Sequence, residues 1–169
     1  MDKKHNFEEL LSMLSEKVLR LGGLVEEAIG KAVRGLVDRD SELAREVPAG
    51  DHEVDKLELE IDDLCLEILA RHQPMARDLR FITTAMKITP DLERIGDHAV
   101  NISERALELN EEPPLRALVD IPLMAMRAQQ MVRGALDAFV REDAQAAWSV
   151  IKMDDELDHR MEQVFRVLL

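Results

Sequence analysis

The sequence predicts an all-α protein built from two tandem antiparallel three-helix bundles, of which the second lacks its last helix. Composition is the first reason: the 169 residues are rich in Leu, Ala, Glu, Arg and Met, and they include no Tyr. Apolar residues also recur at alternating spacings of three and four along most of the chain, the pattern of one buried helix face. The two halves of the chain then match each other at a constant offset.

The first predicted helix begins near Phe7 and continues for about thirty residues, on the order of 45 Å. Four glycines lower its helix propensity: Gly22, Gly23, Gly30 and Gly35. They indicate either close packing against a neighbouring helix or local flexibility. After this helix, Asp40 is predicted to cap a short helix that ends before Pro48.

The second long helix is predicted to start around Gly50, and Pro74 is suited to open the third, which covers residues 75–109. Pro90 lies inside this third helix, where it removes a backbone hydrogen bond. We therefore expect a kink or a broken turn at residues 87–90. The third helix carries one apolar seam: Leu92, Ile95, Ala99, Ile102 and Ala106.

Residues 110–114 form the clearest linker, so residues 1–111 are predicted to be the first bundle and residues 115–169 the second. A fourth helix follows with Pro122 near its start. Its predicted inner face is Met126, Val132, Leu136 and Phe139. A short segment at 143–149 then leads into a fifth helix that continues to Leu169.

An internal repeat relates the two halves at an offset of 103 residues without a gap. Apolar positions match apolar positions, but any two amphipathic helices can be aligned in this way, so these matches are weak evidence for a repeat. Three aspartates also match, and these are harder to explain by chance: Asp40 with Asp143, Asp51 with Asp154, and Asp55 with Asp158. Two copies of one helical unit explain this agreement.

Charge and cysteine content exclude several classes of protein. A net charge of −13 leaves no basic stripe for a nucleic acid. The lone Cys65 falls on an apolar helix position and is predicted to be a packed thiol in a reducing compartment. No run of eighteen apolar residues occurs, and residues 1–6 are charged. We expect a cytoplasmic protein that reaches a membrane only through its partners.

Three carboxylate pairs have a spacing of four residues: Asp51 with Asp55, Glu93 with Asp97, and Asp154 with Asp158. Side chains four apart lie on one helix face, and the first two pairs are predicted to face each other on neighbouring antiparallel helices. Carboxylate oxygens suit hard cations, iron or manganese. The alternative is that these acids are solvated or paired with nearby basic side chains. His98 is either an added nitrogen ligand or an ordinary exposed histidine.

The third predicted helix resembles the signature of a known family. Residues 79–80, 87–88 and especially 91–102, which read Asp-Leu-Glu-Arg-Ile-Gly-Asp-His-Ala-Val-Asn-Ile, are similar to the PhoU family of regulators of bacterial phosphate uptake. The resemblance implies tandem three-helix bundles whose repeated E(D)-x-x-x-D motifs hold multinuclear iron or zinc clusters. Pro90 departs from the family pattern, which usually has a helix-compatible residue at that position.

The resemblance implies a negative regulator rather than an enzyme. Its expected partners are the ATPase subunit of the phosphate ABC transporter and the sensor histidine kinase of phosphate starvation, between which it forms a link. The sequence itself carries no phosphate loop and no nucleophile–base set. The alternative is a carboxylate metal-binding or di-iron bundle protein, which needs two Glu-x-x-His motifs. Only Glu156 and His159 fit that motif.

By the same offset, the counterparts of Glu93 and Asp97 lie at positions 196 and 200, beyond Leu169. The second bundle therefore lacks the helix that would cover its first two. Apolar side chains left partly open are predicted to include Met126, Leu136, Phe139, Met161, Val164 and Leu168. Because such a strip is rarely left open to water, we expect either a natural chain about fifty residues longer or a homodimer.

Overall fold

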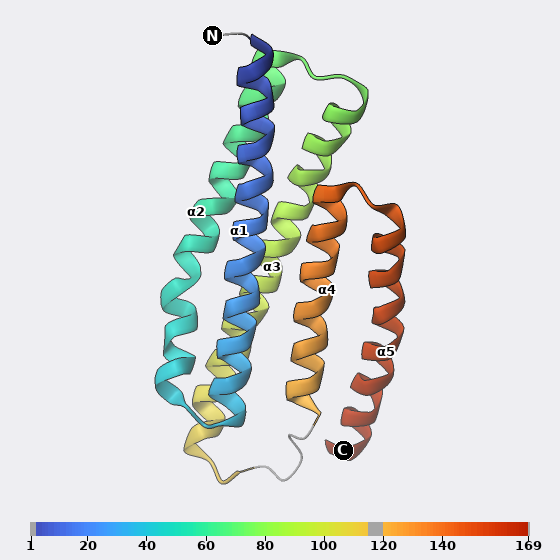
Figure 1. The fold of residues 1–169 in the computed structure, drawn as a ribbon. Helices are drawn as coiled ribbons and strands as arrows, with labels where there is room; N and C mark the ends of the chain where they lie inside the picture. The colour runs from blue at the N-terminus through green and yellow to red at the C-terminus, as the bar shows by residue number, and fades with distance from the viewer. Residues whose placement is uncertain (1–2, 115–119, 169) are drawn as a thin grey trace.

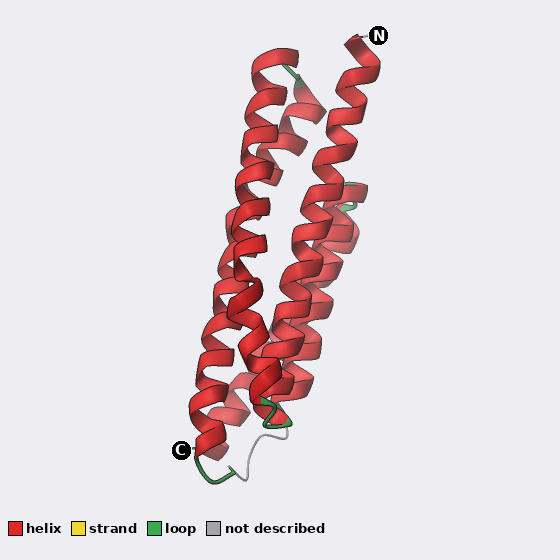
Figure 2. Cartoon of the chain, turned by 90° about the vertical axis from the view of Figure 1, so that its left-hand side faces the viewer, coloured by secondary structure: helices red, strands yellow, loops and turns green. Residues whose placement is uncertain are grey.

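The computed structural model describes residues 3–114 and 120–168, and all regular structure in these ranges is helical (Figure 2). The helices are α1 (Lys3–Val37), α2 (Ser41–His72), α3 (Ala76–Glu111), α4 (Ile121–Arg141) and α5 (Ala144–Leu168). The all-α prediction is confirmed. None of the described helices is long and apolar enough to cross a membrane.

The helices form one complete bundle and one hairpin (Figure 1). Each of α1, α2 and α3 packs against the other two, while α4 packs on α1 and α5 packs on α4. The core lies between α1, α2 and α3, where Leu14, Ile61 and Ile82 are fully buried. Cys65 is also buried there, and burial raises the pKa of its thiol to about 11. The predicted packed thiol is confirmed.

One continuous helix replaces the short helix and break that were predicted around Pro48. Asp40 caps it as expected, because its Oδ1 accepts the backbone N–H of Leu43 at 3.0 Å. The helix then runs through Pro48 and Gly50 to His72. Ala44 and Val47 are buried on the two turns before the proline. Their burial offsets the one backbone hydrogen bond that Pro48 removes.

The broken turn that was predicted near Pro90 does not occur, since α3 is helical without interruption from Ala76 to Glu111. Thr89, which precedes the proline, is buried, and its hydroxyl donates a hydrogen bond of 2.9 Å to the carbonyl of Ala85. Packing against α1 and α2 thus holds this turn in helical geometry although Pro90 lacks an N–H.

The repeat reappears in the corners of the two hairpins. Arg39 and Glu142, which are equivalent at the 103-residue offset, both have a left-handed backbone with φ of 56° and 53°. The next residues, Asp40 and Asp143, both cap the helix that follows. Asp143 accepts the N–H of Ala146 at 2.9 Å, so α5 begins directly after it. The separate segment predicted at 143–149 is therefore wrong.

The apolar seam predicted on α3 is only partly correct, because this helix has two apolar faces. The face inside the first bundle consists of Ile82, Leu92 and smaller residues, which include Gly96 and Ser103. Ile95 and Ile102 are only half-buried, and Ile95 points with Ile88 toward α4. Gly96 and Ser103 were missed because residue size, and not polarity alone, decides which side of a helix can approach its neighbours closely.

A close contact fixes α4 on α1. Leu136 lies directly over Gly22, and a Cβ atom at that glycine would lie 2.0 Å from its Cδ1. One turn along, Gln129 donates a hydrogen bond of 2.7 Å to the backbone carbonyl of Glu26. The Nε of Arg133 donates to the carboxylate of Glu26 at 3.1 Å. Gly22 therefore serves close packing.

The second unit buries its apolar residues less completely than the first. Ala32 and Ile29 of α1 are buried, whereas their counterparts Ala135 and Val132 on α4 are exposed and half-buried. In the first unit, α1 packs against both α2 and α3. Met126, which was predicted to be left partly open, is 44% exposed. The same prediction is wrong for Leu136, which is buried because it packs over Gly22 of α1. The side chain of Leu168 falls outside the described residues.

Replacing Gly22 by Ala tests the contact between α1 and α4, with Gly23→Ala as the matched control. A Cβ at Gly23 meets nothing within 4 Å. Both substitutions gain about 0.5–1 kcal/mol of helix propensity, so their difference isolates the clash with Leu136. We expect Gly22→Ala to be less stable than Gly23→Ala by about 1–3 kcal/mol in urea unfolding. Equal stabilities would contradict the described contact.

Candidate metal centre and adjoining groove

Carboxylates from α2 and α3 meet at the seam between these helices. Asp51 and Asp55 lie on α2, and Glu93 and Asp97 lie on α3, each pair one turn apart. Gly96 of α3 lies beside the α2 pair, since a Cβ atom at this glycine would lie 3.9 Å from Asp51 Oδ1, an ordinary van der Waals separation. The two pairs that the sequence predicted to face each other are thus brought to one seam.

Burial and the charge of neighbouring carboxylates raise the pKa of two of these acids, Asp51 and Glu93. Partial burial raises the pKa of Asp51, and the carboxylates of Asp55 and Asp97 raise it further. Glu93 behaves alike: burial raises its pKa first, then the charge of Asp97, with smaller effects from Glu58 and the α2 pair. No basic side chain in the described ranges pairs with Asp51 or Glu93.

These side chains do not form a ready metal cage. Among residues 3–114 and 120–168, no three His, Cys, Asp or Glu side chains are gathered so that they could hold a metal ion. Coordination would require the carboxylates to rotate toward one another from helix positions that already bring them into electrostatic range. His98 is exposed beside them. The metal role of the four acids stays a prediction.

The third predicted pair lies apart from this seam. Asp154 and Asp158 are exposed on α5, which packs on α4 and not on α2. Their counterparts in the first unit, Asp51 and Asp55, lie on α2, which packs on α3 and brings Asp51 near Asp97. No helix equivalent to α3 stands beside α5 in the described chain, so their metal role also stays a prediction.

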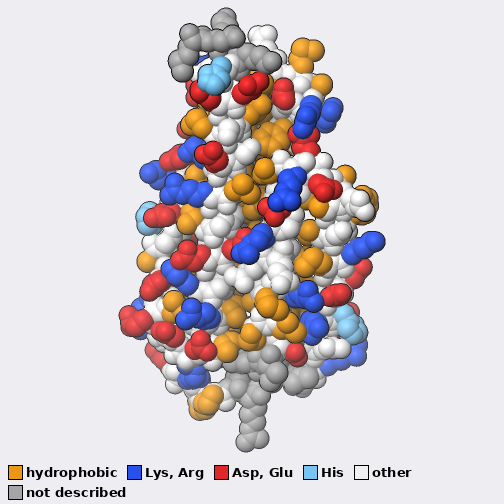
Figure 3. Space-filling model, viewed as in Figure 1, with side chains coloured by type: hydrophobic (Ala, Val, Ile, Leu, Met, Phe, Trp, Pro, Cys, Tyr) orange, Lys and Arg blue, Asp and Glu red, His pale blue; other side chains and the backbone are white. Residues whose placement is uncertain are grey.

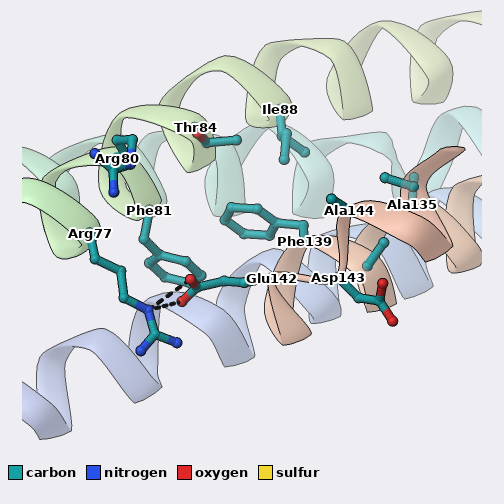
Figure 4. A pocket seen from close by; sticks show the side chains of 12 residues that line it. Arg77, Arg80, Phe81, Thr84, Ile88, Ala135, Phe139, Glu142, Asp143 and Ala144 are labelled. Atoms are coloured by element: carbon teal, nitrogen blue, oxygen red, sulfur yellow. Dashed lines mark hydrogen bonds and ion pairs between the residues drawn. The ribbon is translucent and has the colours of Figure 1, made fainter.

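Sequence reasoning missed a groove between α3 and the α4–α5 hairpin. At one end, a cavity of about 390 Å³ is crossed by an ion pair, in which the Nε of Arg77 donates to both oxygens of Glu142 at 2.8 and 2.7 Å (Figure 4). These hydrogen bonds hold the pKa of Glu142 below its ordinary value. Phe81 and Phe139 stack beside the pair with ring centroids 4.6 Å apart.

The groove becomes apolar toward the middle of the molecule. A second cavity of about 410 Å³ opens between α1, α3, α4 and α5. Its apolar walls include Ile88, Ile95, Met131, Val132, Val150 and Leu157. On the face drawn in Figure 3, hydrophobic side chains emerge along the middle, between charged flanks. Nothing in the sequence places α3 opposite the α4–α5 hairpin, because these helices belong to different repeat units.

Comparison with known families decides which family this fold and seam belong to. A family model described as PhoU domain matches residues 18–106 and 121–169. The chain belongs to the PhoU family. The two matched ranges coincide with the two repeated units, so the PhoU relationship extends over both the closed bundle and the open hairpin.

Individual PhoU relatives are similar over nearly the whole chain. A protein of Aquifex aeolicus described as a phosphate-specific transport system accessory protein PhoU homolog is 42% identical over 159 residues, which are 94% of this chain and 72% of that protein. The crystal structure of PhoU from Pseudomonas aeruginosa has a TM-score of 0.90 at 41% identity, covering 96% of this chain and 78% of that one.

A second crystal structure, of the phosphate transport system regulatory protein PhoU from Streptococcus pneumoniae, has a TM-score of 0.85 at 30% identity. It covers 94% of this chain and 74% of the other. The resemblance that residues 91–102 suggested is thereby confirmed at the level of family and fold.

Neutralising Asp51 should stabilise the metal-free protein at neutral pH. An acid whose pKa is raised by folding binds its proton more tightly in the folded state, so stability falls as the pH rises through the carboxyl titration. We expect Asp51→Asn to raise the free energy of unfolding by about 0.5 kcal/mol at pH 7 in the presence of a chelator.

That gain should vanish below about pH 3, where Asp51 is protonated in both the folded and the unfolded state. Asp63→Asn is the control, because Asp63 is exposed on α2 away from the seam. Urea unfolding at both pH values measures the difference. A loss of stability at pH 7 in the chelated Asp51→Asn protein would contradict the crowded seam.

Proposed function

We propose that this protein is a negative regulator of phosphate uptake and phosphate-starvation signalling. One observation carries the proposal: similarity to phosphate transport accessory and regulatory proteins extends over at least 94% of the chain, in sequence and in fold. The described residues add an acidic helical scaffold with paired carboxylates. Such a scaffold regulates by binding its partners.

The proposed partners are the ATPase subunit of the phosphate ABC transporter and the sensor histidine kinase. A regulator that links them needs extended, rigid surfaces, and helices of 32 to 36 residues in a closed bundle supply these. The strong negative charge favours contact with basic partner surfaces. We also propose that the protein is cytoplasmic and reaches a membrane only through those partners.

The carboxylate seam is the proposed ion site of this regulator. Iron or zinc bound by Asp51, Asp55, Glu93 and Asp97 would offset the repulsion that raises the pKa of Asp51 and Glu93. Oxygen ligands from two helices would also join α2 and α3 at their seam. The metal supplies charge neutralisation there, and the chain supplies the four carboxylates.

A carboxylate metal-binding or di-iron protein is the second candidate, favoured only by the crowding of acids at the seam. Di-iron proteins of this kind need two Glu-x-x-His motifs, and this sequence has one, at Glu156 and His159. Both residues are exposed on α5, and Arg127 lies 3.7 Å from the Glu156 carboxylate as an ion-pair partner. A di-iron site would need Glu156 and His159 to join the carboxylates of α2 and α3, but α5 does not pack on either helix. This separation favours the regulatory function over the di-iron function.

Gene replacement tests the regulatory role. In a host whose own PhoU gene is replaced by this one, we expect a phosphate-starvation reporter to stay repressed in phosphate-rich medium. A frameshifted copy should leave the reporter derepressed. If the intact protein accumulates but leaves the reporter as active as the frameshifted copy does, the regulatory proposal is wrong.

Elemental analysis of protein purified without an affinity tag tests the ion site separately. We expect iron or zinc in the wild type and a loss of at least half of it in a Glu93→Ala, Asp97→Ala variant. Asp63→Asn should keep its metal because Asp63 lies outside the seam. A metal-free wild type after incubation with Fe²⁺ or Zn²⁺ would remove the ion site and leave the regulatory role to be judged by the reporter.

A further inference from the structure

The α4–α5 hairpin is attached to α1 by close packing. Leu136 lies directly over Gly22, and a Cβ atom at Gly30 would lie 3.1 Å from the side-chain amide nitrogen of Gln129. Leu136 is buried in this contact. Because two glycines let the helices approach here, the contact between α1 and α4 depends on shape and burial more than on charge.

The attachment of the same hairpin to α3 is of a different kind. In the described chain, the backbone of α3 comes close to neither α4 nor α5. Long side chains bridge the space instead: Arg77 donates to both oxygens of Glu142, and Phe81 stacks on Phe139 (Figure 4). The hairpin is therefore packed tightly on one side and held by side chains on the other.

The internal repeat shows that Glu142 has a different role from its counterpart, Arg39. Arg39 donates hydrogen bonds of 2.6 Å to the backbone carbonyls of Asn110 and Glu112, at the C-terminal end of α3 in its own unit. A carboxylate cannot donate such bonds, and Glu142 instead accepts from Arg77 at the N-terminal end of α3. The equivalent corners thus hold opposite ends of one helix, and the contact of Glu142 is a contact between units.

The two attachments should respond differently to ions. The side chain of Arg77 is 73% exposed and that of Glu142 is 41% exposed, so water and salt weaken their attraction. The packing of Leu136 on Gly22 carries no charge and is not screened. Breaking the ion pair therefore loosens the hairpin on the side of α3 while α4 stays on α1.

We propose that the Arg77–Glu142 pair and the adjoining phenylalanine stack form an ionic latch that sets the width of the groove between α3 and the hairpin. When the pair breaks, the hairpin rotates about the axis of α4 and α5 moves away from α3. The latch lies at one end of the groove, whose apolar walls continue along Ile88. Opening exposes these walls, so the latch controls how much apolar surface the protein presents.

A distance measurement between α3 and α5 tests the latch. Spin labels on Thr83→Cys and Ser149→Cys, two exposed positions outside the latch, report the width by double electron–electron resonance. The native thiol of Cys65 is buried and is not labelled in the folded protein. We expect one narrow distance distribution at low salt and an open fraction about two- to fivefold larger in 1 M NaCl.

Removal of either partner of the ion pair should have the effect of high salt. We expect Glu142→Gln and Arg77→Gln to have the larger open fraction already at low salt, with little further response to NaCl. The double variant should open no further than either single variant, because both remove the same interaction. Arg141→Gln is the matched control, since Arg141 is exposed beside Glu142 and takes part in no ion pair among the described residues.

A second label pair separates opening of the groove from general loosening. Thr83→Cys and Asp63→Cys report the distance between α3 and α2 inside the closed bundle, and this distance should not change in Glu142→Gln. The proposal is overturned if Glu142→Gln keeps the wild-type width between α3 and α5, if Arg141→Gln widens it equally, or if the distance within the bundle broadens as much.

Discussion

The fold depends on α1, which must be buried from two directions at once. One side packs against α2 and α3, and the other receives α4, whose Leu136 sits over Gly22. A larger side chain at Gly22 would separate the two units, since a packed helix pair tolerates little added volume. The polar contacts from Gln129 and Arg133 to Glu26 set the register at the same crossing. The α4–α5 hairpin is positioned by this contact together with the Phe81–Phe139 stack and the Arg77–Glu142 ion pair on α3.

The helices form two seams that could bind other molecules, and these seams differ in polarity. Between α2 and α3 the seam is acidic, and burial together with repulsion among the carboxylates raises the pKa of Asp51 and of Glu93. Between α3 and the hairpin the seam is apolar, with Ile88 and Ile95 on one wall and the Arg77–Glu142 pair closing one end. The first seam suits ions, and the second suits helix packing.

Much of this was predictable from sequence, because helix periodicity and the repeat carry long-range information. The caps Asp40 and Asp143 follow from local hydrogen bonding, although only the first was predicted. The helix through Pro48 was missed because burial on its neighbouring turns outweighs a local propensity. The stack of Phe81 on Phe139 joins separate units, and no local pattern specifies it.

The central claim is that one helical unit occurs twice and only the first copy is closed. Native-state hydrogen exchange on dilute protein tests it most directly, since amide protection reports local opening. Amides of α2 should exchange slowly, and those at equivalent positions of α5 should exchange much faster, because Val150 and Leu157 are only half-buried. Protection of α5 equal to that of α2 would contradict the account.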